Sequence, residues 1–272
     1  MKSTTARNDE RRKTIMTTCT FLAGAFGAIG RRLVPILLEN GWHVFGSTRS
    51  VDKAAELKKA GVEPVVVDVF DADALRNHLY EIRPNVVIHQ LTDLPYALEA
   101  GQMTAALTRN ARLREVGTRN LVAAARHAGA RRLIAQSISF IYDEGRTDEG
   151  TKPHRETDPL LPVTHPIYGE TVQGVLSLER QVTEAPLEGI VLRYGLIYGP
   201  GTGFDAPIAP GSVYVDAAAK AAELAVTRGE RGIYNVTESD GATSSDKAIK
   251  AFGWNAGWRP TSAVQDAMSS SH

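Results

Sequence analysis

The stretch Thr20-Phe21-Leu22-Ala23-Gly24-Ala25-Phe26-Gly27-Ala28-Ile29-Gly30-Arg31-Arg32-Leu33 decides the fold. An apolar run leads directly into three glycines, Gly24, Gly27 and Gly30, and an amphipathic pattern follows them. Glycine permits a tight turn, close approach of the backbone to a ligand, and close packing of a helix on a strand. A strand, a glycine turn and a helix N-terminus together form a site for the diphosphate of a dinucleotide. A plain strand-to-helix turn is the weaker interpretation.

Strands and helices alternate along the rest of the chain. Strands are predicted at residues 18–23, 43–47, 63–67, 85–89, 132–136, 189–194 and 232–236. Helices are predicted at residues 28–40, 51–60, 71–82, 102–128, 168–184, 215–228 and 244–252. Several strands are almost continuously apolar, which is typical of a parallel sheet covered on both faces by helices. The pattern therefore predicts an α/β fold, a doubly wound parallel Rossmann sheet.

Two proline-rich stretches, residues 143–166 and 199–211, interrupt this alternation. Long loops in compact domains commonly carry binding residues, so both are expected on the substrate side. We expect a disordered leader over residues 1–16 and a dinucleotide-binding Rossmann domain over residues 17–200. Residues 201–272 are expected to form a small, reduced C-terminal substrate lobe together with the last strand and helices of the sheet.

Composition and charge narrow the class of partner. Lys plus Arg and Asp plus Glu both number 31 among 272 residues, so no net field favours nucleic acid or an anionic membrane. We expect a small-molecule substrate and no membrane or nucleic-acid partner; a homodimer is left open. The single cysteine, Cys19, excludes an internal disulfide and favours the cytoplasm. The histidines show no metal-binding spacing, and no metal is expected.

Further motifs follow the glycine turn in order. They are Val66-Val67-Asp68-Val69, Val87-Ile88-His89-Gln90-Leu91-Thr92, Gly117-Thr118-Arg119-Asn120-Leu121-Val122-Ala123-Ala124-Ala125, Leu192-Arg193-Tyr194-Gly195-Leu196-Ile197-Tyr198-Gly199-Pro200-Gly201 and Gly232-Ile233-Tyr234-Asn235-Val236. From about Thr17 to Pro260, the chain resembles the extended short-chain dehydrogenase/reductase superfamily, which includes NAD(P)-dependent epimerases and dehydratases.

The resemblance implies where a dinucleotide cofactor would bind. The contacts would come from the glycine turn and from the ends of the third, fourth and sixth strands, with Asp68 against the adenine. The implied cofactor residues are Gly24, Ala25, Phe26, Gly27, Ala28, Ile29, Gly30, Asp68, Val69, Gln90, Leu91, Thr92, Tyr194, Gly195 and Leu196.

The end of the second strand bears on the choice between NAD and NADP. NAD enzymes place an acid here for the ribose hydroxyls, whereas NADP enzymes use an arginine for the 2′-phosphate. The sequence Gly46-Ser47-Thr48-Arg49-Ser50 contains no acid before Asp52. Arg49, with Ser47 or Ser50, therefore favours NADP, because a guanidinium pairs with a phosphate that a carboxylate would repel. NAD remains an alternative, as does an Arg49 that is simply exposed.

Catalytic residues follow the family pattern only in part. Members carry a Tyr, a Lys four residues later, and a Ser or Thr after the fifth strand. Tyr168 matches the Tyr, but Val172 stands in the Lys position, so Tyr168 is expected to be a weaker acid–base group. Ile138 occupies the usual hydroxyl position, with Ser137 and Ser139 on either side. Tyr168, Ser137 and Ser139 are the catalytic candidates; the alternatives are capping, packing and backbone hydrogen bonding.

The function expected from this pattern is that of an NADP-preferring oxidoreductase. About sixty residues separate Pro200 from Pro260, too few for a full nucleotide-sugar lobe, so we expect reduction of a carbonyl, or oxidation of an alcohol, in a small substrate. An epimerase or dehydratase acting by transient oxidation is one alternative, and a non-catalytic NADP-binding sensor or scaffold is another. Further candidates for the pocket are Asn110, Arg114, Arg193, His154 and His165.

Overall fold

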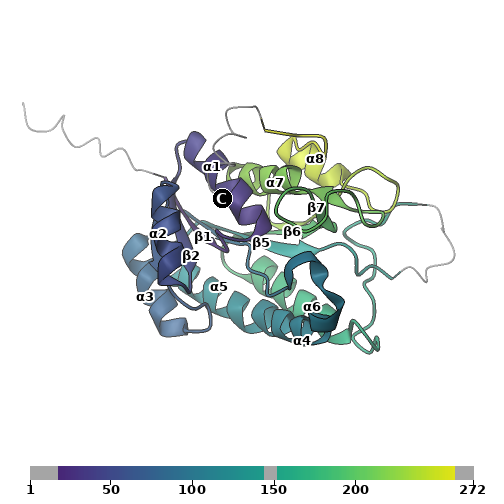
Figure 1. Ribbon diagram of the computed structural model, residues 1–272, viewed down its shortest axis with the longest axis horizontal. Helices are drawn as coiled ribbons and strands as arrows, with labels where there is room; N and C mark the ends of the chain where they lie inside the picture. Colours follow the sequence, from purple (N-terminus) through teal and green to yellow (C-terminus); the bar gives the residue numbers. More distant parts are fainter. Residues whose placement is uncertain (1–17, 144–151, 261–272) are drawn as a thin grey trace, which may run out of the picture.

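The computed structural model describes residues 18–143 and 152–260, and its centre is a seven-stranded sheet (Figure 1). The strand order is β3-β2-β1-β4-β5-β6-β9, and every neighbouring pair is parallel. The strands are β1 (Cys19–Ala23), β2 (His43–Thr48), β3 (Glu63–Val66), β4 (Val86–His89), β5 (Arg132–Ile138), β6 (Glu188–Tyr194) and β9 (Gly232–Val236). This confirms the predicted doubly wound Rossmann fold. The predicted leader lies outside the described residues.

Helices cover both faces of the sheet (Figure 1). One layer contains α1 (Ala28–Glu39), α2 (Val51–Lys59), α7 (Val215–Thr227) and α8 (Asp246–Phe252). The other contains α3 (Ala72–Ile82), α4 (Ala100–Arg112), α5 (Thr118–His127) and α6 (Gly169–Glu184). Local capping sets some of the boundaries: the Ser50 and Asp71 side chains accept the first free N–H groups of α2 and α3, and α8 ends at Gly253 with φ of 69°.

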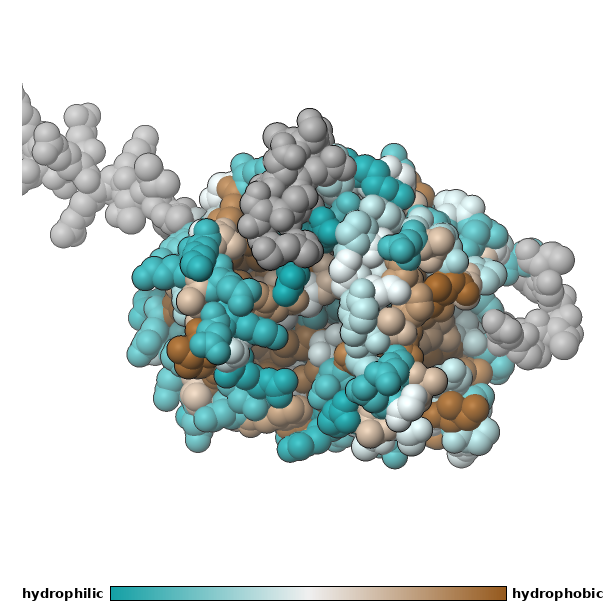
Figure 2. Space-filling view, in the orientation of Figure 1, coloured by the Kyte–Doolittle hydropathy of each residue, from teal (hydrophilic) through white to brown (hydrophobic). Residues whose placement is uncertain are grey.

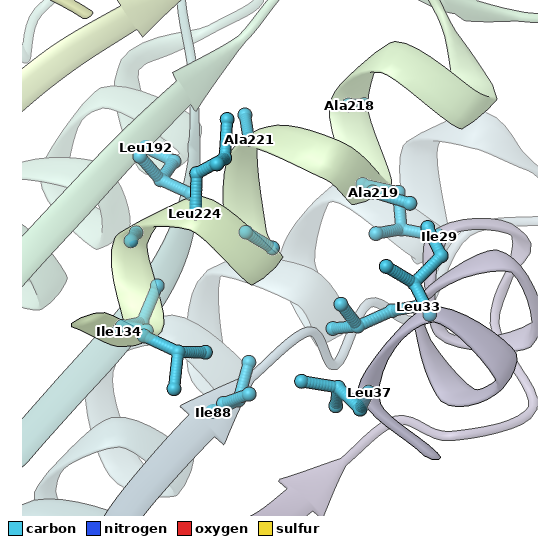
Figure 3. Close-up of a cluster of buried hydrophobic side chains, with 14 of the residues drawn as sticks. Ile29, Leu33, Leu37, Ile88, Ile134, Leu192, Ala218, Ala219, Ala221 and Leu224 are labelled. Carbon is cyan, nitrogen blue, oxygen red and sulfur yellow. The ribbon is translucent and has the colours of Figure 1, made fainter. Parts of the chain in front are cut away.

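The core lies between the sheet and each helical layer. β1 and β4 are buried along their whole lengths, which explains why their sequences are mainly apolar. On the α1–α7 side the contacting residues shown in Figure 3 are Ile29, Leu33 and Leu37 of α1, Ile88, Ile134 and Leu192 of the strands, and Ala218, Ala219, Ala221 and Leu224 of α7. The small alanines let α7 pack closely on the central strands, and this fixes the strand ends that carry the site.

Two local features differ from the expected elements. The single helix predicted over residues 102–128 is divided by a π-helical turn, η2 (Leu113–Gly117), between α4 and α5. A Cβ on Gly117 would lie 2.9 Å from Leu113 Cδ1 and 3.3 Å from Val69 Cγ1, so this turn packs tightly against the chain that follows β3. A short parallel pair, β7 (Ile197–Tyr198) with β8 (Val213–Tyr214), also joins the ends of the 199–211 loop.

The surface is mixed in character. Hydrophilic residues make up much of the face seen in Figure 2, and hydrophobic residues show in patches between them. Within residues 18–143 and 152–260, no helix combines the length and apolarity needed to cross a bilayer. Beyond Pro200 the chain supplies β8, α7, β9 and α8, and β9 joins the same sheet beside β6.

Candidate dinucleotide and substrate site

The glycine turn lies where the chain order of the sheet reverses. β1 pairs with β2 on one side and with β4 on the other, so the loops after β1 and β4 lead to opposite faces and leave a crevice between them. Gly24, directly after β1, has φ of +95°, and a Cβ there would lie 2.7 Å from both the carbonyl carbon and the oxygen of Gln90. Glycine is therefore required at this position.

The other two glycines have different roles. A Cβ on Gly30 would lie only 2.1 Å from the Gly24 carbonyl oxygen, so Gly30 lets α1 pack on the turn. Gly27 is exposed, and its Cβ would have ordinary room, 3.4 Å from the Gly24 oxygen and 3.9 Å from the Gln90 oxygen. The protein itself thus does not require glycine at position 27. An open glycine at the N-terminus of a helix suits close approach by a diphosphate.

A groove of about 410 Å³ runs from this turn across the ends of β2, β3 and β4. It is lined by ten of the predicted cofactor residues: Gly24, Phe26, Gly27, Arg49, Ser50, Asp68, Val69, Gln90, Leu91 and Thr92. Its lining also includes Ser47, Thr48, Lys53, Val67, Phe70, Asp93 and Leu113. Ala25, Ala28, Ile29, Gly30, Tyr194, Gly195 and Leu196 do not line this groove. A hollow of about 1020 Å³ lies along α1 and α2 and reaches the glycine turn at Ala25 and Phe26.

Cationic side chains gather at the β2 end of the groove. Arg49 and Lys53 both line it, and Ser50 caps α2 by accepting a hydrogen bond from Lys53 N at 3.3 Å. The Phe26 ring lies between two cations, with Arg31 Cζ 5.4 Å and Lys53 Nζ 5.6 Å from its centroid. The acids that line the groove, Asp68 and Asp93, follow β3 and β4 instead.

Lys53 escaped the sequence analysis, although a signal for it existed. It lies in the first turn of α2, where the partial positive charge of the helix N-terminus disfavours a cation. Lys53 stands three residues after the Ser50 cap and adds a second cation to the groove beside Arg49.

The β3 end of the groove is held by hydrogen bonds. Asp68 Oδ1 accepts from Phe70 N at 2.9 Å, and Asn120 Nδ2 donates to Val69 O at 2.9 Å. Asp68 therefore shapes the turn after β3 as well as lining the groove. Asn120 ties this turn to α5.

The β4 end contains a polar atom without a partner. Gln90 Nε2 donates to the Tyr194 hydroxyl at 3.3 Å, whereas Gln90 Oε1 is buried and accepts no hydrogen bond from any described residue. Burial raises the pKa of Tyr194, which therefore stays a neutral phenol. A Cβ on Gly195 would lie 1.8 Å from Gly211 O, so this residue lets the 199–211 loop close onto β6. Tyr194 and Gly195 thus support the site from beneath.

Ser137 lies in β5 and is fully buried. Its Oγ donates to Glu179 Oε1 of α6 at 2.8 Å, and Arg193 donates to both Glu179 oxygens at 2.7 and 2.6 Å. Arg193 also donates to the Tyr142 hydroxyl at 2.8 Å, which in turn donates to Asn235 Oδ1 at 2.7 Å. This network joins β5, α6, β6 and β9, so it has the character of a structural element.

Ser139 differs from Ser137. Its residue is only 4% exposed, and its backbone N donates to Tyr194 O at 2.9 Å. Its Oγ makes no hydrogen bond with a described residue, so this hydroxyl is less constrained than that of Ser137, although Ser139 does not line the groove.

Tyr168 stands at the start of α6 and is 39% exposed. Its ring stacks on His165, with centroids 5.3 Å apart, and His165 Nδ1 accepts from Tyr168 N at 3.1 Å. A Cβ on Gly169 would lie 2.3 Å from Val163 O, which explains the Tyr-Gly pair as a close approach of the loop to α6. Val172, in the position of the family lysine, is completely buried.

His154, another candidate for the pocket, contacts residues outside the groove. His154 stacks on Tyr142, with centroids 4.9 Å apart, and lies 3.6 Å from the Asp158 carboxylate. No group of three His, Cys, Asp or Glu side chains that could hold a metal ion occurs in the part of the chain that the structure describes.

Comparison with known proteins agrees with this geometry. A family model described as NAD(P)H-binding matches residues 24–165. The chain is 37% identical over 244 residues to the 3-diazoavenalumate denitrifying reductase of a Streptomyces species, which covers 82% of this chain and 77% of the relative. This chain belongs to the NAD(P)H-binding family. It is an NAD(P)-dependent oxidoreductase of the extended short-chain dehydrogenase/reductase type, as the sequence predicted.

Two further relatives are informative. The chain is 27% identical over 184 residues to the 4-hydroxy-2-methyl-3-oxo-4-farnesyl-3,4-dihydroquinoline-1-oxide ketoreductase of Stigmatella aurantiaca, with 67% of this chain but only 46% of that relative covered. UDP-glucose 4-epimerase of Thermotoga maritima, solved with UDP-glucose, superposes with a TM-score of 0.70 at 18% identity and covers 92% of this chain and 97% of the other. The last likeness establishes the fold.

Proposed function

We propose that this oxidoreductase is an NADPH-dependent reductase of a small carbonyl compound. The observation that carries the choice of cofactor is the β2 end of the groove, which presents Arg49, Ser50 and Lys53 and has no acid there. Two cations and a helix N-terminus favour a phosphate, because charged hydrogen bonds and the helix dipole act together. The 2′-phosphate of NADPH supplies that charge.

The turn and groove fit the rest of the cofactor. The open backbone at Gly27 suits the diphosphate, and the free Gln90 Oε1 is a buried acceptor that a bound ligand can satisfy. Bound NADPH would supply a hydride from C4 of its nicotinamide ring. The hydride would go to the carbonyl carbon, and a proton must reach the carbonyl oxygen.

The proton has two candidate donors in this chain. The Tyr168 hydroxyl and Ser139 Oγ make no hydrogen bond with a described residue, whereas Ser137 is held by Glu179. We therefore assign proton donation to Tyr168 with Ser139, and a structural role to Ser137. With Val172 buried in place of a lysine, no ammonium on α6 favours a tyrosinate base, so reduction is the preferred direction.

Val172 in place of the family lysine also favours a second candidate reaction. The relative named as a denitrifying reductase acts, by its name, on a diazo compound. Hydride transfer to a carbon bearing a diazonium group forms a C–H bond and releases N₂ with the electrons of the broken C–N bond, and it needs no proton donor. Valine in place of the family lysine would therefore not lower the rate of such a reaction.

Titration of NADPH and NADH by calorimetry tests the cofactor assignment. Arg49→Ala and Lys53→Ala should each weaken NADPH by about 1.5–3 kcal/mol, roughly 10- to 150-fold, and leave NADH nearly unchanged. Lys58→Ala is the matched control, because Lys58 is exposed on α2 and does not line the groove. Equal losses for both cofactors would contradict the 2′-phosphate role.

Turnover decides the reaction. We expect NADPH oxidation with members of a carbonyl panel, or with an aryl diazonium salt and release of N₂. NADPH binding without turnover on either class would instead favour a non-catalytic sensor. Interconversion of sugar epimers with retained cofactor would favour an epimerase.

A further inference from the structure

Arg114 is a buried cation that the mechanism so far does not use. It lies in the π-helical turn between α4 and α5 and is 6% exposed. It makes no hydrogen bond or ion pair with any residue of 18–143 or 152–260. Buried charges in proteins are normally paired, because an unpaired one loses its hydration without compensation. π-helical turns are also frequent at functional sites.

Glu179, the acid whose charge acts on Arg114, is already bound by other residues. Burial lowers the pKa of the Arg114 guanidinium to about 10, and the charge of Glu179 opposes that shift. Both Glu179 oxygens are already bound by Arg193, and one also accepts from Ser137. Asp93, the acid that follows β4, pairs instead with Arg109 at 3.2 Å. A positive charge is left over at Arg114.

Two hydrogen bonds locate this charge. Asn110, one turn before Arg114, accepts from Asp93 N at 3.1 Å, and Thr118, one turn after it, lies 3.1 Å from His89 Nε2. Arg114 therefore faces the chain between His89 and Asp93. That chain is Gln90-Leu91-Thr92, which lines the groove, as does Leu113 beside Arg114.

Arg114 lies directly behind the groove lining. Its neighbour Leu113 lines the groove, whereas Arg114 itself is buried and does not. A carboxylate bound beside Leu113 would place its charge next to this uncompensated guanidinium.

We propose that Arg114 is an anion subsite that binds a carboxylate of the substrate beside the hydride-transfer position. This inference rests on the reductase function proposed above and specifies its substrate class. A guanidinium holds a planar carboxylate through two parallel hydrogen bonds, and a partly dehydrated one does so most strongly. The subsite would select small acids over their neutral analogues and would orient them by one end.

Arg114 also offers an explanation for Val172. The family resemblance places a cation on α6, and this chain instead directs one toward the groove from η2. On this proposal the positive charge would serve recognition of an acid instead of activation of a base.

The test uses benzoate and its neutral analogue benzamide as probes. Each is titrated into the complex of the full chain with NADP⁺, and binding is followed by saturation-transfer NMR. Wild type should bind benzoate at least tenfold more tightly than benzamide. Arg114→Gln should abolish that preference, and Arg114→Lys should keep part of it. Arg119→Gln is the control, because Arg119 is an exposed arginine on the adjoining α5.

Two further measurements keep the outcomes distinct. NADPH affinity should be the same in Arg114→Gln as in wild type, and a weaker affinity in the variant would contradict the subsite. Failure of wild type to bind NADPH at all would refute the proposed function instead. Arg114→Met should melt no lower than wild type, since it removes an unpaired buried charge. Equal binding of the two probes by wild type, retained benzoate preference in Arg114→Gln, or unfolding of both Arg114→Gln and Arg114→Met would each overturn the proposal.

Discussion

The two ends of the groove are built in different ways. At the glycine turn the backbone makes the site, and the roles of Gly24, Gly27 and Gly30 follow from where a Cβ could fit. On the proposed substrate side, side chains decide the chemistry, and their state depends on residues distant in the sequence: Glu179 binds the Ser137 hydroxyl, and its charge acts on Arg114. A backbone site tolerates little change within a family, whereas a side-chain site can exchange its charges.

This difference locates the chemistry that is particular to this chain. Cofactor binding uses the fold that the chain shares with its family, including distant epimerases. The proposed reaction would depend on Val172 in place of the lysine, on Tyr168, and on the buried Arg114. Substitutions in the glycine turn should therefore abolish cofactor binding completely, whereas substitutions on the substrate side should lower reaction rates by degrees.

The largest effect is expected from Gly27→Val. A Cβ has ordinary room at this exposed position, and the valine side chain would fill the space in which the backbone would meet a diphosphate. NADPH and NADH binding should therefore both be lost while the fold persists. Calorimetry and thermal melting measure the two properties. Gly101→Val, at an open glycine in α4, is the control and should bind normally. Unchanged affinity in Gly27→Val would remove the cofactor assignment.

The next effect separates the two candidate reactions. Tyr168→Phe removes a proton donor at small steric cost, so carbonyl reduction should slow by about 10²-fold or more, or about 3 kcal/mol in activation free energy. Reduction of a diazonium substrate should keep most of its rate, because no proton is transferred. Steady-state kcat with NADPH measures both. Full activity toward carbonyls would transfer the donor role to Ser139 or water.

The sequence predicted features whose causes are local. The glycine turn was recognisable because strand, glycines and helix are contiguous, and buried strands were recognisable because both of their faces are apolar. The groove could be predicted from these strand ends, and Arg49 from the residue after β2. Lys53 was missed because a helical lysine is usually solvated.

The substrate end was less predictable because its contacts are long-range. Ser137 meets Glu179 across 42 positions of sequence, and nothing near Ser137 indicates that its hydroxyl is engaged. The π-helical turn that presents Arg114 depends on the packing of Gly117 against Val69. The helical periodicity of the sequence predicts a continuous helix over these residues. It does not reveal the extra residue that a π-helical turn contains.

The pH dependence of unfolding tests whether the buried His89 is neutral in the folded protein. Burial, and then the charge of Arg114, lower the pKa of His89 to about 4 from an unfolded value near 6.5. Between these values the unfolded chain binds the extra proton, so stability should fall as pH drops from 6.5 to 4, by about 3 kcal/mol in total. Urea unfolding of His89→Gln should lack this component, and His127→Gln, at an exposed position near the end of α5, is the control. Parallel pH profiles for wild type and His89→Gln would show that His89 is not held neutral.

The smallest effect distinguishes the two serines. Ser137→Ala removes a hydrogen bond to a charged group in a fully buried network, which should cost about 2 kcal/mol of unfolding free energy. Arg193 still neutralises Glu179, so the fold should survive and cofactor affinity should be unchanged. Ser139→Ala is the matched variant: its free hydroxyl holds nothing together, so stability should stay within about 0.5 kcal/mol while kcat for carbonyl reduction falls. Urea unfolding should therefore show the larger loss of stability in Ser137→Ala, and turnover should show the larger loss of kcat in Ser139→Ala. A Ser137→Ala protein with normal stability and lost activity would make Ser137 the proton donor and reverse the assignment.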